Sequence, residues 1–208
     1  SGVPNALSAA FNITNDVADY ISVTSEPQNT EAGSVIGGTP TATVFDQYGN
    51  SVSGVDVTVD PNQSAFASGT TTVQSDANGV SAFDDLIIND AADDYQLFFQ
   101  SAGVTTGNSV FFEISNASPD TIIIQTQPNE TVAGAAISGP PKVSVVDEFS
   151  NPVQGETVTI SEAGGYTIDA GTLSLVTDEN GEVEYTDLVI NTEGINYQFR
   201  FSVDGIEN

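Results

Sequence analysis

Short segments in which apolar residues alternate with polar ones run through the whole chain. They are rich in Val, Ile, Thr, Phe and Tyr, and clusters of Gly, Asn, Asp and Pro separate them at roughly 8–12-residue spacing, which is typical of β-strands and their turns. Alternation with a period of two indicates strands that bury one face. No long segment shows helical periodicity. We therefore predict an all-β protein.

The first half of the chain contains about seven predicted strands, together with a looser edge segment at 33–40 and a short apolar run at 86–88 that continues one strand or starts another. The predicted strands are 20–25, 41–45, 55–59, 70–74, 80–83, 95–99 and 110–114.

The second half of the chain repeats the first. Gly2 aligns with Gly103 and the turn 46–50 with 147–151, both at an offset of 101 residues. One residue is inserted near Gly164, and the offset is 102 from Gly171 onward. A period this long indicates tandem domains. We predict domains at 19–118 and 119–208, preceded by an N-terminal strand and linker at 1–18.

About seven short strands in each hundred residues is the pattern of an immunoglobulin-like sandwich. The sequence therefore predicts two tandem immunoglobulin-like β-sandwiches with an N-terminal donor-type strand. Tyr95 and Tyr197 precede equivalent strands, where each would form a tyrosine corner.

The N-terminal segment aligns with the last strand of repeat one. Ala9, Phe11 and Ile13 form its apolar face and align with the strand at 110–114, whereas repeat two reaches 204–208 without an equivalent strand. A sandwich that lacks its last strand has an unpaired edge and an uncovered part of its core. We expect the N-terminal strand to fill the place of the last strand in a repeat-two sandwich.

Two interpretations of these ends remain open. In the first, residues 1–14 insert into repeat two of another copy, because they reach about 45 Å while two sandwiches end to end measure roughly 70–80 Å. Such head-to-tail donation produces an open filament or pilus whose partners are copies of the chain. In the second, the chain is a two-repeat excerpt of a large cell-surface adhesin stalk. Both predict an extracellular structural protein, and neither identifies an adhesion receptor.

The net charge limits the classes of partner that the chain can bind. The chain has 29 acidic residues against two basic ones, a net charge of −27. Phosphate backbones and anionic membrane surfaces would be repelled, so no nucleic acid is expected as a partner. No apolar run is long enough to span a membrane.

Catalytic residue types are scarce. The chain has no His and no Cys, which excludes Ser–His–Asp and Cys–His arrangements, and adjacent carboxylates such as Asp84 and Asp85 are typical of a solvated surface. We predict no enzymatic activity. A carbohydrate-binding module is a weaker alternative, because Trp is absent and most aromatic residues occupy repeated, core-like positions.

Calcium is the one cofactor that the sequence suggests, since carboxylates and loop carbonyls are its ligands. The alternative is that these Asp and Asn side chains cap turns by bonding their own backbone. The candidate ligands are Asp46, Asn50, Asp76, Asn78, Asp90, Asp93 and Asp94, and the first two pairs recur in repeat two.

Glycosylation is a further candidate modification. Sequons begin at Asn12, Asn62, Asn116 and Asn129, and Pro119 after the third makes that one the poorest acceptor.

Several segments of the chain resemble those of one known protein family. The segment 46–54, the strand at 57–59 and the segment 76–83 resemble bacterial Ig-like repeats of the invasin and intimin type, and 151–160 and 180–185 repeat the pattern. The resemblance implies extracellular stalks, adhesins and filaments in which such domains act as spacers. The donated strand resembles that of donor-strand-complemented pilins. In repeat two Ser150 occupies the position that Gly49 has in repeat one, and this departure weakens the expectation of the same turn geometry there.

Overall fold

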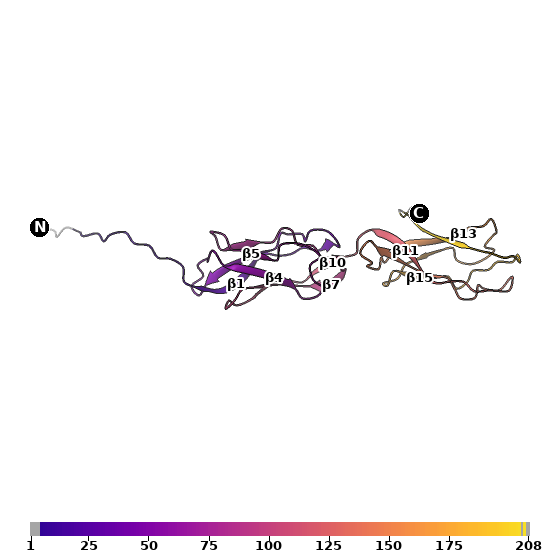
Figure 1. The fold of residues 1–208 in the computed structure, drawn as a ribbon, viewed down its shortest axis with the longest axis horizontal. Helices are drawn as coiled ribbons and strands as arrows, with labels where there is room; N and C mark the ends of the chain where they lie inside the picture. Colours follow the sequence, from indigo (N-terminus) through magenta and orange to yellow (C-terminus); the bar gives the residue numbers. More distant parts are fainter. Residues whose placement is uncertain (1–4, 205, 207–208) are drawn as a thin grey trace. The chain divides into compact units, whose positions relative to one another are not determined.

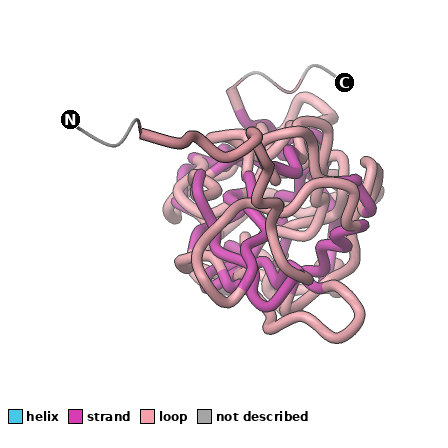
Figure 2. The backbone as a smooth tube through the Cα atoms, turned by 90° about the vertical axis from the view of Figure 1, so that its left-hand side faces the viewer, coloured by secondary structure: helices cyan, strands magenta, loops and turns pink. Residues whose placement is uncertain are grey.

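The computed structural model describes residues 5–204 and 206 and contains strands and loops but no helix over that range (Figure 2). The all-β prediction is confirmed. No helix in these residues is long and apolar enough to cross a membrane. Residues 1–4, 205, 207 and 208, which belong to the predicted N-terminal segment and to the final turn, lie outside the described residues.

Contacts divide the chain into two compact units. Unit 1 holds Val35–Leu86 and Asp94–Phe112 together with the chain up to Gln28, and unit 2 holds Asn29–Ser34, Ile87–Asp93 and the chain from Glu113 onward. The loops 29–34 and 87–93 therefore belong to repeat one by sequence and to unit 2 by contact.

Repeat one forms a three-stranded sheet in the order β1-β3-β6 and a four-stranded sheet in the order β5-β4-β8-β9. Figure 1 labels β1 of the first sheet and β4 and β5 of the second. A third sheet has the order β2-β10-β7, with β2 parallel to β10. The strands are β1 (Ala18–Ser25), β2 (Thr30–Glu31), β3 (Thr41–Asp46), β4 (Asp56–Pro61), β5 (Thr72–Gln74), β6 (Val80–Ala82), β7 (Ala92–Tyr95), β8 (Leu97–Gln100), β9 (Gly107–Asn108) and β10 (Phe112–Ser115).

The period of two explains which side chains fill this core. In β3 Val44 is fully buried, and in β4 Val57 is fully buried, each between more exposed neighbours on at least one side. Phe83, just after β6, packs against Phe99 of β8 with ring centroids 5.5 Å apart, so the β1-β3-β6 sheet faces the β5-β4-β8-β9 sheet across the core. This is a β-sandwich.

Repeat two builds the same two sheets in the orders β11-β12-β15 and β14-β13-β16. Its strands are β11 (Pro119–Thr126), β12 (Lys142–Asp147), β13 (Thr157–Glu162), β14 (Ser174–Val176), β15 (Glu182–Glu184) and β16 (Phe199–Val203). The register is repeated as well, since Ile21 pairs with Val44 in the first sandwich and Ile122 with Val145 in the second. The prediction of two tandem sandwiches agrees with this architecture.

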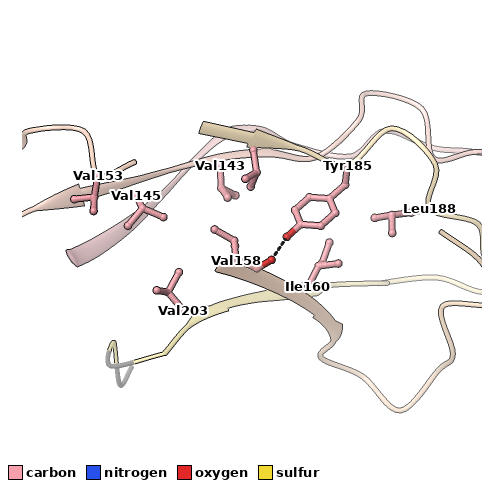
Figure 3. Packing of buried hydrophobic residues seen from close by; sticks show 9 residues of the cluster. Val143, Val145, Val153, Val158, Ile160, Tyr185, Leu188 and Val203 are labelled. Carbon is pink, nitrogen blue, oxygen red and sulfur yellow. Dashed lines mark hydrogen bonds between the residues drawn. The ribbon is translucent and has the colours of Figure 1, made fainter. Parts of the chain in front are cut away.

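The core of repeat two is aliphatic around one buried tyrosine (Figure 3). The Tyr185 hydroxyl donates to the Val158 carbonyl at 2.7 Å, so this buried polar group has a partner. Desolvation raises the pKa of Tyr185 to about 12, which keeps the hydroxyl protonated and donating.

Two local predictions can be compared with the backbone. The Tyr197 hydroxyl donates to the carbonyl of Thr192, five residues upstream, which is the contact of a tyrosine corner. Ser150 has φ 72° and its counterpart Gly49 has φ 82°, so the serine adopts the same left-handed turn despite the sequence departure.

Candidate functional site: an open groove beside β16

The two sandwiches differ at one edge. In repeat one β8 pairs with β4 on one side and with β9 on the other, where Phe98 lies opposite Asn108 and Phe99 opposite Gly107. In repeat two β16 is the counterpart of β8 and pairs with β13. Within the described part of the chain, no strand pairs with the other edge of β16.

The open edge uncovers apolar side chains. Leu97 and Phe99 of β8 have 0% exposure, whereas their counterparts Phe199 and Phe201 are only half-buried. On the facing strand Ile21 is 5% exposed, whereas its counterpart Ile122 is half-buried. The same core positions therefore remain partly in water in repeat two.

These side chains line a groove of about 550 Å³ between β11 and β16. Its lining consists of Ile122, Ile124, Phe199, Arg200, Phe201, Ser202 and Ile206. An adjoining groove of about 520 Å³ shares Ile124 and Phe199 and extends along β16 to Tyr197. Ile124, which faces both grooves, is 44% exposed. The lining combines apolar side chains with the polar residues Arg200 and Ser202, and one wall is the edge of β16 with which no described strand pairs.

Residues 5–15 of the N-terminal segment form no strand, and they precede β1 in the chain (Figure 1). The strand predicted around Ala9, Phe11 and Ile13 is therefore absent from the single chain. A strand without a neighbour has no hydrogen-bond ladder to hold it. Phe11 is 78% exposed and Ile13 is 88% exposed.

The counterparts of these residues in repeat one are core residues. Phe11 aligns with Phe112, which is 4% exposed, and Ile13 aligns with Ile114, which is 1% exposed. Ala9 aligns with Val110, which is 54% exposed. The completed sandwich of repeat one thus turns Phe112 and Ile114 inward and Val110 outward.

Sequence reasoning did not select Ser8. Its counterpart Ser109 is 4% exposed, accepts a hydrogen bond from the Leu97 amide on Oγ at 2.9 Å and donates its own amide to the Leu97 carbonyl at 2.9 Å. The signal for this role was the exact match between Ser8 and Ser109, since hydrophobicity alone does not mark a serine as inward-facing.

The same type of hydrogen bond, from a backbone amide to an Asp carboxylate, holds the chain at the start of each sandwich. The Asp16 amide donates to Asp46 Oδ2 at 2.9 Å, and the Ala117 amide donates to Asp147 Oδ2 at 2.9 Å. Asp16 also accepts a bond from Gln47 Nε2 at 2.9 Å. Asp16 and Ala117, which occupy equivalent positions of the two repeats, are thus anchored in the same way.

Burial raises the pKa of Asp46, but hydrogen bonds from the Asn50 side chain and from the amides of Asp16, Asn50 and Tyr48 outweigh it and lower the pKa to about 2. The carboxylate is therefore ionised at neutral pH and fully occupied as an acceptor.

The candidate calcium ligands lie in turns of this kind. Asp76 Oδ1 accepts the amides of Asn78 at 2.8 Å and of Val80 at 2.9 Å, which lowers the pKa of Asp76. Asp94 has φ 60°, and its carbonyl accepts a bond from Asn62 Nδ2 at 2.8 Å. The described residues contain no group of three or more His, Cys, Asp or Glu that could hold a metal ion. The bonds at Asp46 and Asp76 are those of turn capping, and the calcium prediction, which extends to Asp90 and Asp93, stays untested.

The sequons differ in their surroundings. Asn12 and Asn129 are exposed, whereas the Asn62 amide is engaged on both sides, since its Oδ1 accepts the Gln96 amide at 2.8 Å. Glycosylation at Asn12, Asn62 and Asn129 stays a prediction.

The fold defines the class: tandem, all-β sandwiches of immunoglobulin type. No family model and no curated protein matches the sequence. Among solved structures, the chain is similar to the D0-D1 domain of intimin, with 17% identity over 91% of this chain and 92% of that one and a TM-score of 0.39.

Two further structures are similar to the chain. One is FdeC, an Escherichia coli adhesin, with 15% identity over 91% of this chain and 62% of that one and a TM-score of 0.47. The other is invasin, a bacterial integrin-binding protein, with 17% identity over 89% of this chain and 36% of that one and a TM-score of 0.44. They are proteins of the kind that the sequence resembles. The fold assignment rests on the strand order and register described above.

Proposed function

We propose that this chain is a structural subunit of an extracellular rod of Ig-like sandwiches, and that residues 5–14 of one copy complete the second sandwich of the next copy. One observation carries the proposal: the open groove beside β16 occupies the position that β9 covers in repeat one, where β9 pairs with β8. The exposed N-terminal segment has the sequence pattern of that covering segment.

The physical gain comes from two sources. Phe11 and Ile13 would each leave water, which is worth about 1.5–3 kcal/mol for a fully buried side chain of this size. The backbone would bond to the open edge of β16 as β9 bonds to β8, at about 0.5–1.5 kcal/mol net for each hydrogen bond. Several such bonds together with two buried side chains make a plausible strand-addition interface.

A second copy is the source of the strand in this proposal. The Asp16 to Asp46 hydrogen bond fixes the base of the segment on repeat one, so residues 5–14 are displayed from their own first sandwich. Donor and acceptor surfaces are different parts of the chain, so their pairing is heterologous and continues from copy to copy without closing.

A stalk segment of a cell-surface adhesin is the second candidate function. The repeated anchor bond of Ala117 to Asp147 supports it, because it shows how one chain runs from a completed sandwich into the next. In that case the strand that fills the groove beside β16 belongs to the same polypeptide. The surface location and the structural role are common to both candidates.

The deciding experiment measures assembly of the purified 208-residue chain by sedimentation velocity and electron microscopy. We expect head-to-tail oligomers whose length grows with concentration, and we expect deletion of residues 1–14 to remove them. Phe11→Asp should act like the deletion, whereas the matched control Asn12→Asp should not, since its counterpart Glu113 is exposed. If the 208-residue chain without the deletion stays monomeric at every concentration, donation between copies is refuted and the stalk segment remains.

A further inference from the structure

The turn that follows β3 in the first sandwich recurs after β12 in the second, with the same capping bonds. Asp46 accepts the Tyr48 and Asn50 amides at 2.9 and 2.8 Å, and Asp147 accepts the Phe149 and Asn151 amides at 2.9 and 2.8 Å. The environments of the two turns differ. Tyr48 is 74% exposed while its counterpart Phe149 is half-buried, and Asn50 is exposed while Asn151 is 8% exposed.

The difference arises from contacts made within unit 2. Asn151 Nδ2 donates to the Asn89 carbonyl at 2.8 Å, and Asn151 Oδ1 accepts the Ala91 amide at 2.9 Å. The ring of Phe149 lies against Gly33 so closely that a Cβ at this glycine would overlap it. The loops 29–34 and 87–93, which belong to unit 2 by contact, thus form a receptor surface for the Asp147–Asn151 turn.

The receptor surface also occurs a second time. Gly134 is the counterpart of Gly33, with φ 81° against 77°, and Asn191 is the counterpart of Asn89. The local backbone bonds agree, because the Gly33 amide donates to the Ile88 carbonyl at 3.0 Å and the Gly134 amide donates to the Ile190 carbonyl at 2.9 Å.

No aromatic ring of a described residue lies against Gly134 in this second receptor surface. In the described structure, the nearest atom to a Cβ placed on Gly134 is Asn191 Oδ1 at 3.6 Å, which is ordinary contact distance. Gly134 is exposed, whereas Gly33 is partly buried. The chain therefore carries one engaged pair of turn and receptor, one exposed turn and one exposed receptor.

We propose that the exposed turn of one copy docks on the exposed receptor of another, with the Tyr48 ring against Gly134 and the Asn50 side chain bonded to the backbone at Asn191 and Glu193. The proposal rests on head-to-tail assembly and names a second contact of that interface beyond the donated strand. Asn50 Nδ2 would donate to the Asn191 carbonyl and Asn50 Oδ1 would accept the Glu193 amide, as Asn151 does with Asn89 and Ala91.

Asn50 and Tyr48 are available for this role. The Asn50 Nδ2 atom donates to the two carboxylate oxygens of Asp46 at 3.3 and 3.0 Å, and the residue is otherwise exposed. Gly134 suits an aromatic ring because the missing Cβ lets the ring approach the backbone. A side chain at this positive φ would also strain the turn.

The second contact changes what the interface does mechanically. A strand alone joins two bodies through one segment, whereas a ring and two hydrogen bonds placed away from it restrict the rotation of one body against the other. Once the strand is bound, the turn and receptor meet at high effective concentration, so a small contact contributes measurably to assembly.

The test places a photoreactive benzophenone side chain at Tyr48 in one copy and mixes it with an isotopically labelled copy. After assembly and irradiation, mass spectrometry should find crosslinks from position 48 of one copy to the peptide around Gly134 or Asn191 of the other. The same side chain at Phe149 is the internal reference and should crosslink near Gly33 within one copy. Tyr48→Ala should raise the concentration needed for assembly about tenfold, while the matched control Phe111→Ala, also an exposed aromatic at 61%, should not.

The outcomes separate this inference from the proposed function. Oligomers that form normally but crosslink from position 48 elsewhere, or that ignore Tyr48→Ala, overturn the turn–receptor contact and leave strand donation standing. A chain that forms no oligomers at all refutes strand donation, and the contact proposed here falls with it.

Discussion

Truncation of Phe11 tests the link between groove and donor most directly. Phe11 is 78% exposed in the single chain, and its counterpart Phe112 is 4% exposed in the completed sandwich. If Phe11 fills the groove beside β16 as Phe112 fills repeat one, Phe11→Ala removes a buried aromatic ring from the assembled state and almost nothing from the free state.

The magnitude follows from core truncations. Phe to Ala at buried sites costs about 3–5 kcal/mol. The groove is open at its edge, so we take the lower limit of about 3 kcal/mol, which corresponds to a factor of about 150 in the dissociation constant. The assay is sedimentation velocity over a concentration series, with the weight-average mass fitted to head-to-tail association.

Asn12→Ala is the control, because its counterpart Glu113 is exposed and lies between two buried positions of β10. Phe112→Ala is the internal reference, since it should destabilise folding of the first sandwich by a comparable amount. Equal effects of Phe11→Ala and Asn12→Ala on association would refute the alternating inward face on which the donor assignment rests.

Four further outcomes follow from the described structure. Hydrogen bonds hold the pKa of Asp46 at about 2, below the unfolded value near 3.8. The ionised carboxylate therefore stabilises the fold fully above about pH 4, and this contribution to the free energy of unfolding is lost as the pH falls from about 4 to 2. Urea unfolding at a series of pH values should show the decline, and Asp46→Asn should flatten it. Tyr185→Phe deletes the bond to the Val158 carbonyl, which should cost about 0.5–1.5 kcal/mol in the same assay. Ser150→Gly relieves a left-handed residue with φ 72° and should raise stability by about 0.5–1 kcal/mol, measured as a higher urea midpoint at unchanged slope. Millimolar calcium should leave the melting temperature unchanged if Asp46 and Asp76 only cap turns, and a rise would instead support the predicted metal site.

Most of the strand framework could be predicted from the sequence. The segment predicted at 41–45 is β3 (Thr41–Asp46), because alternating apolar residues and turn residues determine this element locally. The segment predicted at 95–99 covers the end of β7 (Ala92–Tyr95) and most of β8 (Leu97–Gln100). The segment predicted at 70–74 shortens to β5 (Thr72–Gln74), since pairing with β4 extends over three residues only.

The groove was only partly predictable. The repeat alignment located a missing strand, but the difference in burial between Leu97 and Phe199 depends on which edges pair in three dimensions. Local pattern also predicted a strand at residues 9–13, which the single chain does not form because no neighbour supplies a ladder. The roles of Tyr48 and Asn50 could not be found in the sequence, since they emerge from comparing the surroundings of two equivalent turns.

The uncovered edge of β16 has a thermodynamic consequence for the melting of the protein. A sandwich that is finished by another molecule gains stability by mass action, so its melting temperature rises with protein concentration, whereas a sandwich that supplies all its own strands melts at a fixed temperature. Repeat one contains β9 and β10, and repeat two depends on the donated strand under the proposal. Calorimetry of dilute and concentrated samples should therefore show one stationary transition and one that moves, and the moving transition belongs to the second sandwich.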